Sequence, residues 1–211
     1  MESLRIITAI KPQRRSVKVF LDGEPSLTLS SKVAVEVGLA IGQALSEEGL
    51  RELELKELSH RALEKALRLL SYRPRSEWEV RSRLRGQGFG EEVIGLVTGK
   101  LREMGLLDDL AFARAFKESR EAFRPRSKLH LIRELREKGV APEIIAEAVA
   151  DMDDESEAYR AGLKKARSFC GKSFPEFRKK LGAYLCRRGF DWEVIRRVTP
   201  RLWQEIGGES S

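Results

Sequence analysis

The clearest pattern of hydrophobic positions in this chain occurs three times. Each copy has a leucine, then a glycine followed by an apolar residue, then apolar positions spaced three and four apart, which is the period of one helix face. The first copy consists of Leu84, Gly88, Phe89, Val93, Ile94, Val97 and Leu101. The second consists of Leu135, Gly139, Val140, Ile144, Ile145, Ala148 and Met152, and the third of Leu185, Gly189, Phe190, Val194, Ile195, Val198 and Leu202. A recurrence at about 50 residues is typical of a repeat protein.

The glycine of each copy predicts the end of a helix. Glycine just beyond a helix adopts the left-handed conformation, and the apolar residue after it then packs on the last turn. The predicted packing pairs are Leu84 with Phe89, Leu135 with Val140, and Leu185 with Phe190. We therefore expect each copy to be a pair of helices joined at the glycine, preceded by one further helix.

The N-terminal residues follow a different pattern. Between residues 5 and 29 the apolar positions alternate with polar ones in three short runs, separated by Pro12 to Arg15 and by Asp22-Gly23. Alternation bounded by turn residues predicts strands, here a small three-stranded antiparallel sheet. A short helix from Ser31 to Val37 should follow and end at Gly38. The bases at the first turn, Lys11, Arg14, Arg15 and Lys18, are interpreted as a solvated hairpin tip.

These patterns predict a mainly α fold of three tandem three-helix repeats in an elongated array, with a small N-terminal β-rich domain. The predicted boundaries are 1–45 for the β-sheet domain with its short helix, 46–57 for an acidic helical connector, 58–106, 107–153 and 154–206 for the repeats, and 207–211 for a disordered tail. Ser76 and Glu79 form a capping-box pattern that opens a helix expected to bury Trp78 and Leu84. In the third repeat the middle helix should begin about a turn earlier, near Ser173.

Charge adds a functional indication. The chain carries a net charge of +7 with 35% charged residues, which favours an anionic partner such as nucleic acid or an acidic protein surface. Residues 147–157 hold six acids and no base, whereas residues 160–201 hold thirteen lysines and arginines against three acids. No apolar run approaches the length of a membrane helix and the N-terminus lacks a signal-peptide core, so we expect a cytoplasmic protein.

Residues with catalytic potential are sparse. The two histidines, His60 and His130, do not stand at metal-ligand spacing, and no phosphate-binding glycine loop or nucleophile-elbow motif is present. Cys170 and Cys186 are interpreted as reduced thiols. The pair Asp108-Asp109 is better explained as the cap of the helix that follows than as a metal site. We expect a protein that is not an enzyme, with no cofactor, no metal and no small-molecule substrate.

Basic residues are the remaining candidates for function. Arg73 and Arg75 stand at a corner between helices, and Arg124 and Arg126 repeat them around a second proline. The last repeat adds Lys172, Arg178, Lys179, Lys180, Arg187, Arg188, Arg196 and Arg197. In a stacked array, equivalent corners would lie on one side and could follow a phosphate backbone. The alternative is a solvated surface whose bases pair locally with acids.

Several motifs resemble those of the RecX family of recombinase regulators. They are the segment from Ala66 to Arg73, Ser76-x-x-Glu79, Gly88-Phe89, Gly105-Leu106-Leu107-Asp108-Asp109 with Phe112-Ala113, Leu135-x-x-Lys138-Gly139-Val140, and the Gly-Phe turn of the third repeat. The resemblance covers about residues 58–205. It implies a three-helix repeat array that lies in the groove of the RecA–DNA filament and inhibits ATP hydrolysis and strand exchange. The RecA filament is the implied partner, with single- or double-stranded DNA as a further candidate and no membrane.

Two other functions remain open at this point. Helix, glycine turn and helix also describe a helix-turn-helix module that binds specific DNA sequences. Against this, the third helices of the first two repeats begin with Glu91-Glu92 and Pro142-Glu143, where acids would face phosphate. The other alternative is a nucleic-acid-binding protein that depends on charge alone and acts without RecA.

Overall fold

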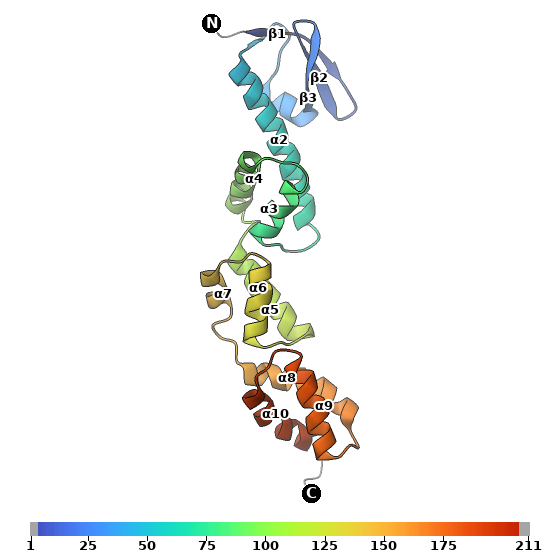
Figure 1. Cartoon of the computed structure of the whole chain (residues 1–211). Helices are drawn as coiled ribbons and strands as arrows, with labels where there is room; N and C mark the ends of the chain where they lie inside the picture. Colours follow the sequence, from blue (N-terminus) through green and yellow to red (C-terminus); the bar gives the residue numbers. More distant parts are fainter. Residues whose placement is uncertain (1–3, 207–211) are drawn as a thin grey trace. The chain divides into compact units, whose positions relative to one another are not determined.

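A computed structural model describes residues 4–206, which form two compact units. One unit contains the residues up to Pro74 together with 80–106, and the other contains 75–79 and the residues from Leu107 onward. The described residues contain a small N-terminal sheet followed by three groups of three helices (Figure 1). The predicted fold class is therefore confirmed. The predicted disordered tail, 207–211, lies outside the described residues.

The sheet has four antiparallel strands in the order β3-β2-β1-β4. The predicted strands are β1 (Arg5–Pro12), β2 (Ser16–Leu21) and β3 (Glu24–Ser30), and the prediction of three strands missed β4 (Ala44–Leu45). A strand of two residues is too short to show alternation of apolar and polar positions, and β4 is defined only by its pairing with β1. At the β2–β3 turn, Asp22 and Gly23 both have positive φ, of 51° and 89°, as a tight two-residue hairpin requires.

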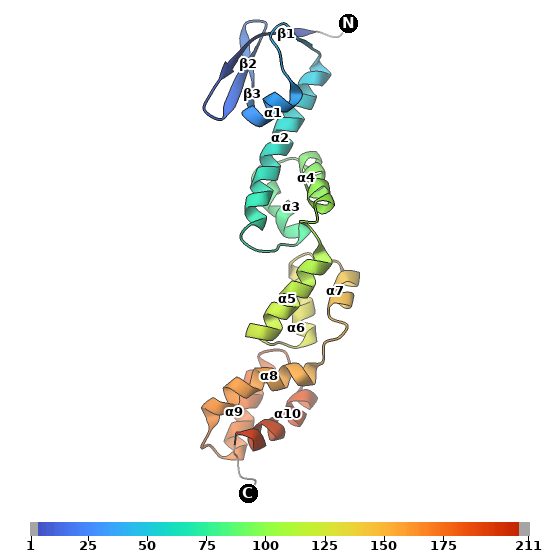
Figure 2. The ribbon, with the colours of Figure 1, turned by 180° about the vertical axis from the view of Figure 1, so that it is seen from behind.

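The sheet packs its inner face against two helices, seen from both sides in Figures 1 and 2. One is α1 (Ser31–Val37), capped by Ser30 and closed by Gly38, and the other is the start of α2 (Glu47–Leu70). Helix α2 runs for 24 residues without a break, so the acidic connector and the first helix of repeat 1 are one helix. Its Leu53 belongs to the core of the sheet, whereas Ala62 and Ala66 are buried in the first repeat.

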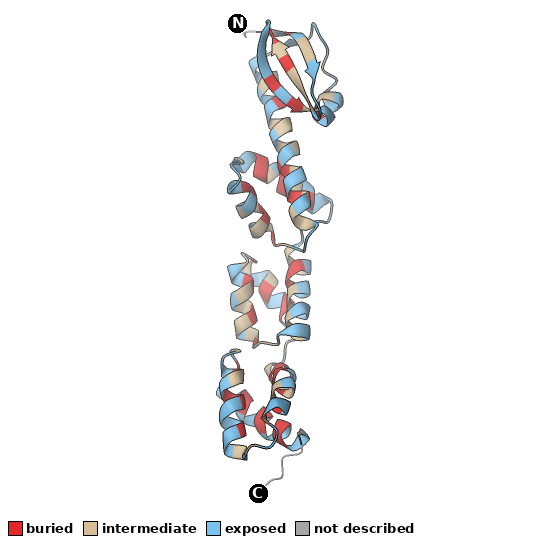
Figure 3. Ribbon diagram, turned by 90° about the vertical axis from the view of Figure 1, so that its right-hand side faces the viewer, coloured by how far each residue is buried: buried red, intermediate tan, exposed pale blue. Residues whose placement is uncertain are grey.

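Each repeat has its own hydrophobic core, drawn in red in Figure 3. Repeat 1 consists of α2, α3 (Glu77–Arg85) and α4 (Glu91–Glu103), and repeat 2 of α5 (Asp109–Phe123), α6 (Lys128–Glu137) and α7 (Pro142–Ala148). Repeat 3 consists of α8 (Asp154–Ala166), a short 3₁₀ turn (Arg167–Phe169), α9 (Phe174–Cys186) and α10 (Trp192–Glu205). Helix α9 has 13 residues against nine in α3 and ten in α6, which confirms the predicted early start.

The predicted helix closures are present in all three copies. In each copy the N–H of the residue after the glycine donates to the carbonyl of the buried leucine. The bonds are Phe89 to Leu84 (3.3 Å), Val140 to Leu135 (3.2 Å) and Phe190 to Leu185 (3.3 Å). The glycines have φ of 85°, 73° and 87° in the same order. The hydrophobic pattern therefore marks helix ends and core positions.

One predicted core residue is not in a core. Leu84 is buried, but Trp78 is 51% exposed, so the expectation that its helix buries both was wrong for the tryptophan. The ring lies against Gly139, where an added Cβ would overlap Cβ and Cγ of Trp78. The glycine of repeat 2 therefore closes a helix and also receives a tryptophan from the start of α3.

Candidate nucleic-acid and partner interface

The corner arginines divide into an exposed pair and a pair that turns inward. Arg73 and Arg124 are exposed, the first beside the carbonyl of Pro74 to which its Nη1 donates (2.9 Å). The side chains of Arg75 and Arg126 are only 22% and 29% exposed. Their Nε atoms are buried without a hydrogen-bond partner in the described part of the chain.

The inward arginines have acidic partners nearby. Arg75 lies 3.9 Å from Glu79, and Arg126 lies 3.6 Å from Glu134 and also contacts the ring of His130. Burial lowers the pKa of His130, as does the charge of Arg126, so the ring is disposed to be neutral. These contacts give Arg75 and Arg126 a structural role, whereas Arg73 and Arg124 present their charge to solvent.

The two corners belong to equivalent junctions built on a buried serine. Ser76 donates from Oγ to the carbonyl of Lys138 (2.5 Å), and Ser127 donates from its backbone N–H to the carbonyl of Arg188 (3.2 Å). Lys138 and Arg188 each precede the closing glycine of a following repeat. The junctions thus fix the inward arginines next to a helix-closing turn.

An aspartate pair completes each junction. Asp108 caps α5 by accepting from the N–H groups of Leu110 and Ala111, which confirms the predicted cap. Its neighbour Asp109 accepts instead from the N–H of Glu77 (2.8 Å), at the start of α3. In the second junction Asp153 caps α8, and Asp154 accepts from the N–H of Lys128 (2.6 Å). One aspartate therefore caps its own helix, and the next caps a helix of the preceding repeat.

Asp109 provides a test of this arrangement. Burial raises the pKa of its carboxyl, and the charges of Glu77 and Asp108 raise it further, against the lowering effect of the Glu77 N–H. A raised pKa means that the ionised form opposes folding, so this contribution to stability is present at low pH and is lost as pH rises through the folded pKa. We expect D109N, which keeps the accepting oxygen, to match the wild type in acid and to exceed it at neutral pH.

The matched variant D109A should be less stable than D109N at every pH. It leaves the Glu77 N–H without its acceptor, at a cost of about 1–3 kcal/mol. Urea denaturation of both variants between acidic and neutral pH measures the two effects. A D109A protein as stable as D109N would show that the hydrogen bond to α3 contributes nothing.

The acidic stretch 147–157 is used inside repeats 2 and 3. Glu147 pairs with Arg114 (2.8 Å) and Asp151 with Lys117 (2.5 Å). Glu155 lies 2.9 Å from Arg201 and 3.6 Å from Arg197, so these two bases of α10 share one carboxylate. The remaining bases of the last repeat have few acids left to pair with.

Most of the predicted basic residues of repeat 3 are exposed, but they differ in their partners. Arg188 donates to the carbonyl of Pro125 (3.0 Å) and lies over the ring of Tyr184, so it is part of a junction. The neighbouring amine of Lys172 lowers the pKa of Lys180. Four further bases are exposed and form no ion pair with a described residue: Arg178, Lys179, Arg187 and Arg196.

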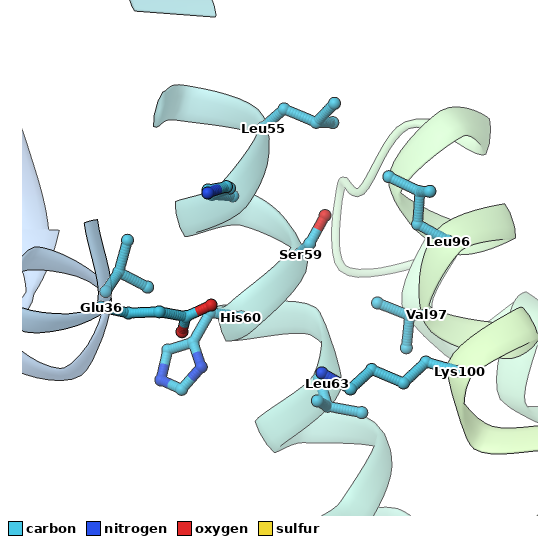
Figure 4. Close-up of a pocket in the computed structure, with 10 residues that line it drawn as sticks. Glu36, Leu55, Ser59, His60, Leu63, Leu96, Val97 and Lys100 are labelled. Atoms are coloured by element: carbon cyan, nitrogen blue, oxygen red, sulfur yellow. The ribbon is translucent and has the colours of Figure 1, made fainter. Parts of the chain in front are cut away.

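A cavity of about 320 Å³ lies in the first unit between α1, α2 and α4 (Figure 4). Leu63, Leu96 and Val97 contribute apolar walls, and the buried hydroxyl of Ser59 has no hydrogen-bond partner in the described residues. Its neighbour His60 pairs with Glu64 (3.5 Å). Because adjacent helical residues point in different directions, Ser59 and His60 cannot act as a nucleophile and its base.

Residues 4–206 contain no cluster of three or more histidine, cysteine, aspartate or glutamate side chains that could hold a metal ion. None of the described helices is long and apolar enough to cross a membrane. Cys170 and Cys186 are exposed free thiols.

The three helical groups correspond one by one to known family models. Residues 62–101 match the first three-helix domain of RecX, 108–149 the second, and 153–199 the third. The chain belongs to the RecX family. Regulatory protein RecX of Prosthecochloris aestuarii is 38% identical over 144 residues, covering 68% of this chain and 95% of that protein. Regulatory protein RecX of Lactobacillus gasseri is 32% identical over 203 residues, covering 93% of this chain and 74% of that protein.

Two crystal structures of RecX proteins show the same fold. A regulatory protein RecX superposes with a TM-score of 0.69 at 21% identity, covering 93% of this chain and 99% of that one. RecX from Lactobacillus salivarius superposes with a TM-score of 0.60 at 21% identity, covering 70% of this chain and 97% of that one. The N-terminal sheet is thus included in the first match.

In this RecX-family chain, sequence reasoning missed the second aspartate of each pair. Asp109 and Asp154 hold the helix of another repeat, a role that reading Asp108-Asp109 as one cap did not distinguish. The recurrence of the pair as Asp153-Asp154 was the available signal. A cap needs one carboxylate, so a second one at the same place in two repeats points to a second acceptor role.

Proposed function

We propose that this protein is a non-enzymatic regulator of the RecA recombinase, which binds along the groove of the RecA–DNA filament and inhibits ATP hydrolysis and strand exchange. The main support is membership of the RecX family over all three repeats. The exposed bases Arg178, Lys179, Arg187 and Arg196 fit this role because they form no ion pair within the described residues.

Within this proposal, the contact residues are the exposed predicted bases. Arg73 and Arg124 serve at the corners, and Arg178, Lys179, Lys180, Arg187 and Arg196 serve in repeat 3. Arg75, Arg126 and Arg188 are assigned to the junctions, with Arg197 held by Glu155. Lys172 lies near Lys180, whose pKa it lowers, and remains a candidate contact on the same surface.

The helix-turn-helix alternative has less support. Its recognition helix would present Glu91 at the N-terminus of α4, and this carboxylate accepts hydrogen bonds from Arg81 (2.8 Å) and Arg85 (2.7 Å). The Arg85 and Arg81 bonds lower the pKa of Glu91, which keeps the group anionic. Because two arginines hold this carboxylate, it is not available to contact a base edge at the start of a recognition helix.

The test is ATP hydrolysis by RecA on single-stranded DNA with substoichiometric amounts of the full chain added. We expect inhibition below one protein per RecA, because one molecule that spans several filament subunits affects all of them. Unchanged hydrolysis at equimolar protein would remove the RecA proposal and leave the charge-dependent nucleic-acid-binding alternative.

A further inference from the structure

Repeat 3 carries an exposed tryptophan on a glycine platform. Trp192 is the first residue of α10 and is 62% exposed. Its ring atom Cζ3 lies 3.7 Å from the position that a Cβ of Gly182 would occupy on α9. Because position 182 has no side chain, the indole rests close to the helix while much of the ring remains open to solvent.

Unpaired bases from two helices flank this ring. Arg178 and Lys179 lie one turn before Gly182 on α9, and Arg196 lies one turn after Trp192 on α10. All three are exposed and form no ion pair with another residue in 4–206. The open aromatic ring therefore lies on the same two helices as three bases that form no ion pair in the described residues. Of the two acids beside it in the chain, Asp191 caps α10 by accepting from the N–H of Glu193, and Glu193 is exposed.

We propose that Trp192, Arg178, Lys179 and Arg196 form a binding site for single-stranded nucleic acid. The indole stacks on one unpaired base, and the three cations contact the phosphates on either side. Proteins that bind single strands without sequence preference combine a basic surface with aromatic rings in this way. This inference deepens the proposed function, since it places repeat 3 in direct contact with the DNA of the filament.

Two observations favour nucleic acid over an acidic protein as the partner. Residues 160–201 carry thirteen bases and three acids. Arg160 pairs with Glu157, and Arg197 and Arg201 share Glu155, but the remaining excess of bases still suits a continuous polyanion. The positions equivalent to Trp192 are Glu91 and Pro142 in the other repeats, so the ring occurs only where the excess of bases occurs. Stacking also requires an unpaired base, which selects single strands over duplex.

The test uses the full chain without RecA and a fluorescently labelled oligothymidylate at low salt. Replacing Trp192 with alanine should weaken binding about tenfold, the loss of one stacked base. Tryptophan fluorescence should be quenched on binding in the wild type and much less in W192Y, which should nevertheless retain most of the affinity. The control L129A removes another exposed apolar side chain, 67% exposed on α6, and should bind like the wild type.

Four further results decide the inference. A base-free polyanion such as heparin should bind without quenching Trp192, and quenching by heparin would contradict stacking. Full affinity in W192L would likewise contradict it, because leucine has no π face. If W192A binds the oligonucleotide normally but no longer inhibits RecA, Trp192 contacts a protein, and the nucleic-acid site is wrong while the RecA role stands. If oligonucleotide binding quenches the tryptophan fluorescence of the wild type but the protein leaves ATP hydrolysis by RecA unaffected, the site stands and the RecA role is wrong.

Discussion

Replacing Gly139 with alanine is expected to destabilise the second unit by about 2–5 kcal/mol. Gly139 has φ of 73°, a conformation that costs an L-residue about 1–2 kcal/mol. In addition, the new Cβ would overlap Cβ and Cγ of Trp78, and overpacking of this kind adds about 1–3 kcal/mol. Because these atoms are close to the backbone of α3, a rotamer change alone cannot relieve the overlap.

Other glycines of this chain separate the two contributions. Gly171, in the same unit, and Gly88, at the equivalent repeat position, have φ of 79° and 85° with no atom within 4 Å of an added Cβ. G171A and G88A should therefore lose about 1–2 kcal/mol, from backbone conformation alone. The loss of stability in G189A should lie between that of these two variants and that of G139A, since its Cβ would lie 2.7 Å from Ser127 Oγ and 3.1 Å from His130 Cβ.

Urea denaturation followed by circular dichroism measures the whole series, with the transitions of the two units treated separately. A cost for G139A equal to that of G171A would show that Trp78 does not pack on the glycine. It would also remove the physical reason for the exposed position of this tryptophan.

Reversing three unpaired bases of repeat 3 is expected to weaken binding to the RecA–DNA filament at least about tenfold. The variant R178E/R187E/R196E changes only exposed side chains that form no ion pair within the described residues. Each lost phosphate contact to a single strand should also reduce the slope of log affinity against log salt by about 0.7. Affinity for preassembled filament, measured by fluorescence anisotropy across a salt series, gives both quantities.

The chain offers a control with the same change in net charge. K11E/R14E/R15E reverses three exposed bases near the β1–β2 hairpin. This variant should bind the filament nearly as the wild type does if the site is local to repeat 3. An equal loss in both variants would mean that overall charge, and not the surface of repeat 3, governs binding.

The repeat architecture was predictable because its signals are local. A glycine with positive φ and an apolar residue next to it define a helix end within six residues, as Leu84 and Phe89 illustrate. Likewise, Asp22-Gly23 marked a hairpin whose geometry depends on those two residues alone. Strand β4 could not be predicted, since two residues become a strand only when β1 lies beside them.

Contacts between residues distant in the sequence explain what the sequence left undecided. The apolar character of Trp78 indicated burial, but its contact is Gly139, 61 residues later, at a partly exposed junction. Counting charges in the sequence identified the excess of bases in repeat 3 but not which of these bases pair with acids. Only the structure shows that Arg197 and Arg201 share the carboxylate of Glu155 and that Arg75 and Arg126 turn inward.

The measurement that tests the central claim most directly compares two salt series with the full chain. One follows inhibition of RecA ATP hydrolysis on single-stranded DNA, and the other follows binding to the same DNA without RecA. Charge-driven binding to bare DNA weakens steeply with salt, whereas contacts with the RecA protein add affinity to that of the DNA contacts alone. The account predicts that inhibition persists at salt concentrations where binding to bare DNA is lost. Loss of both at the same salt concentration would contradict it.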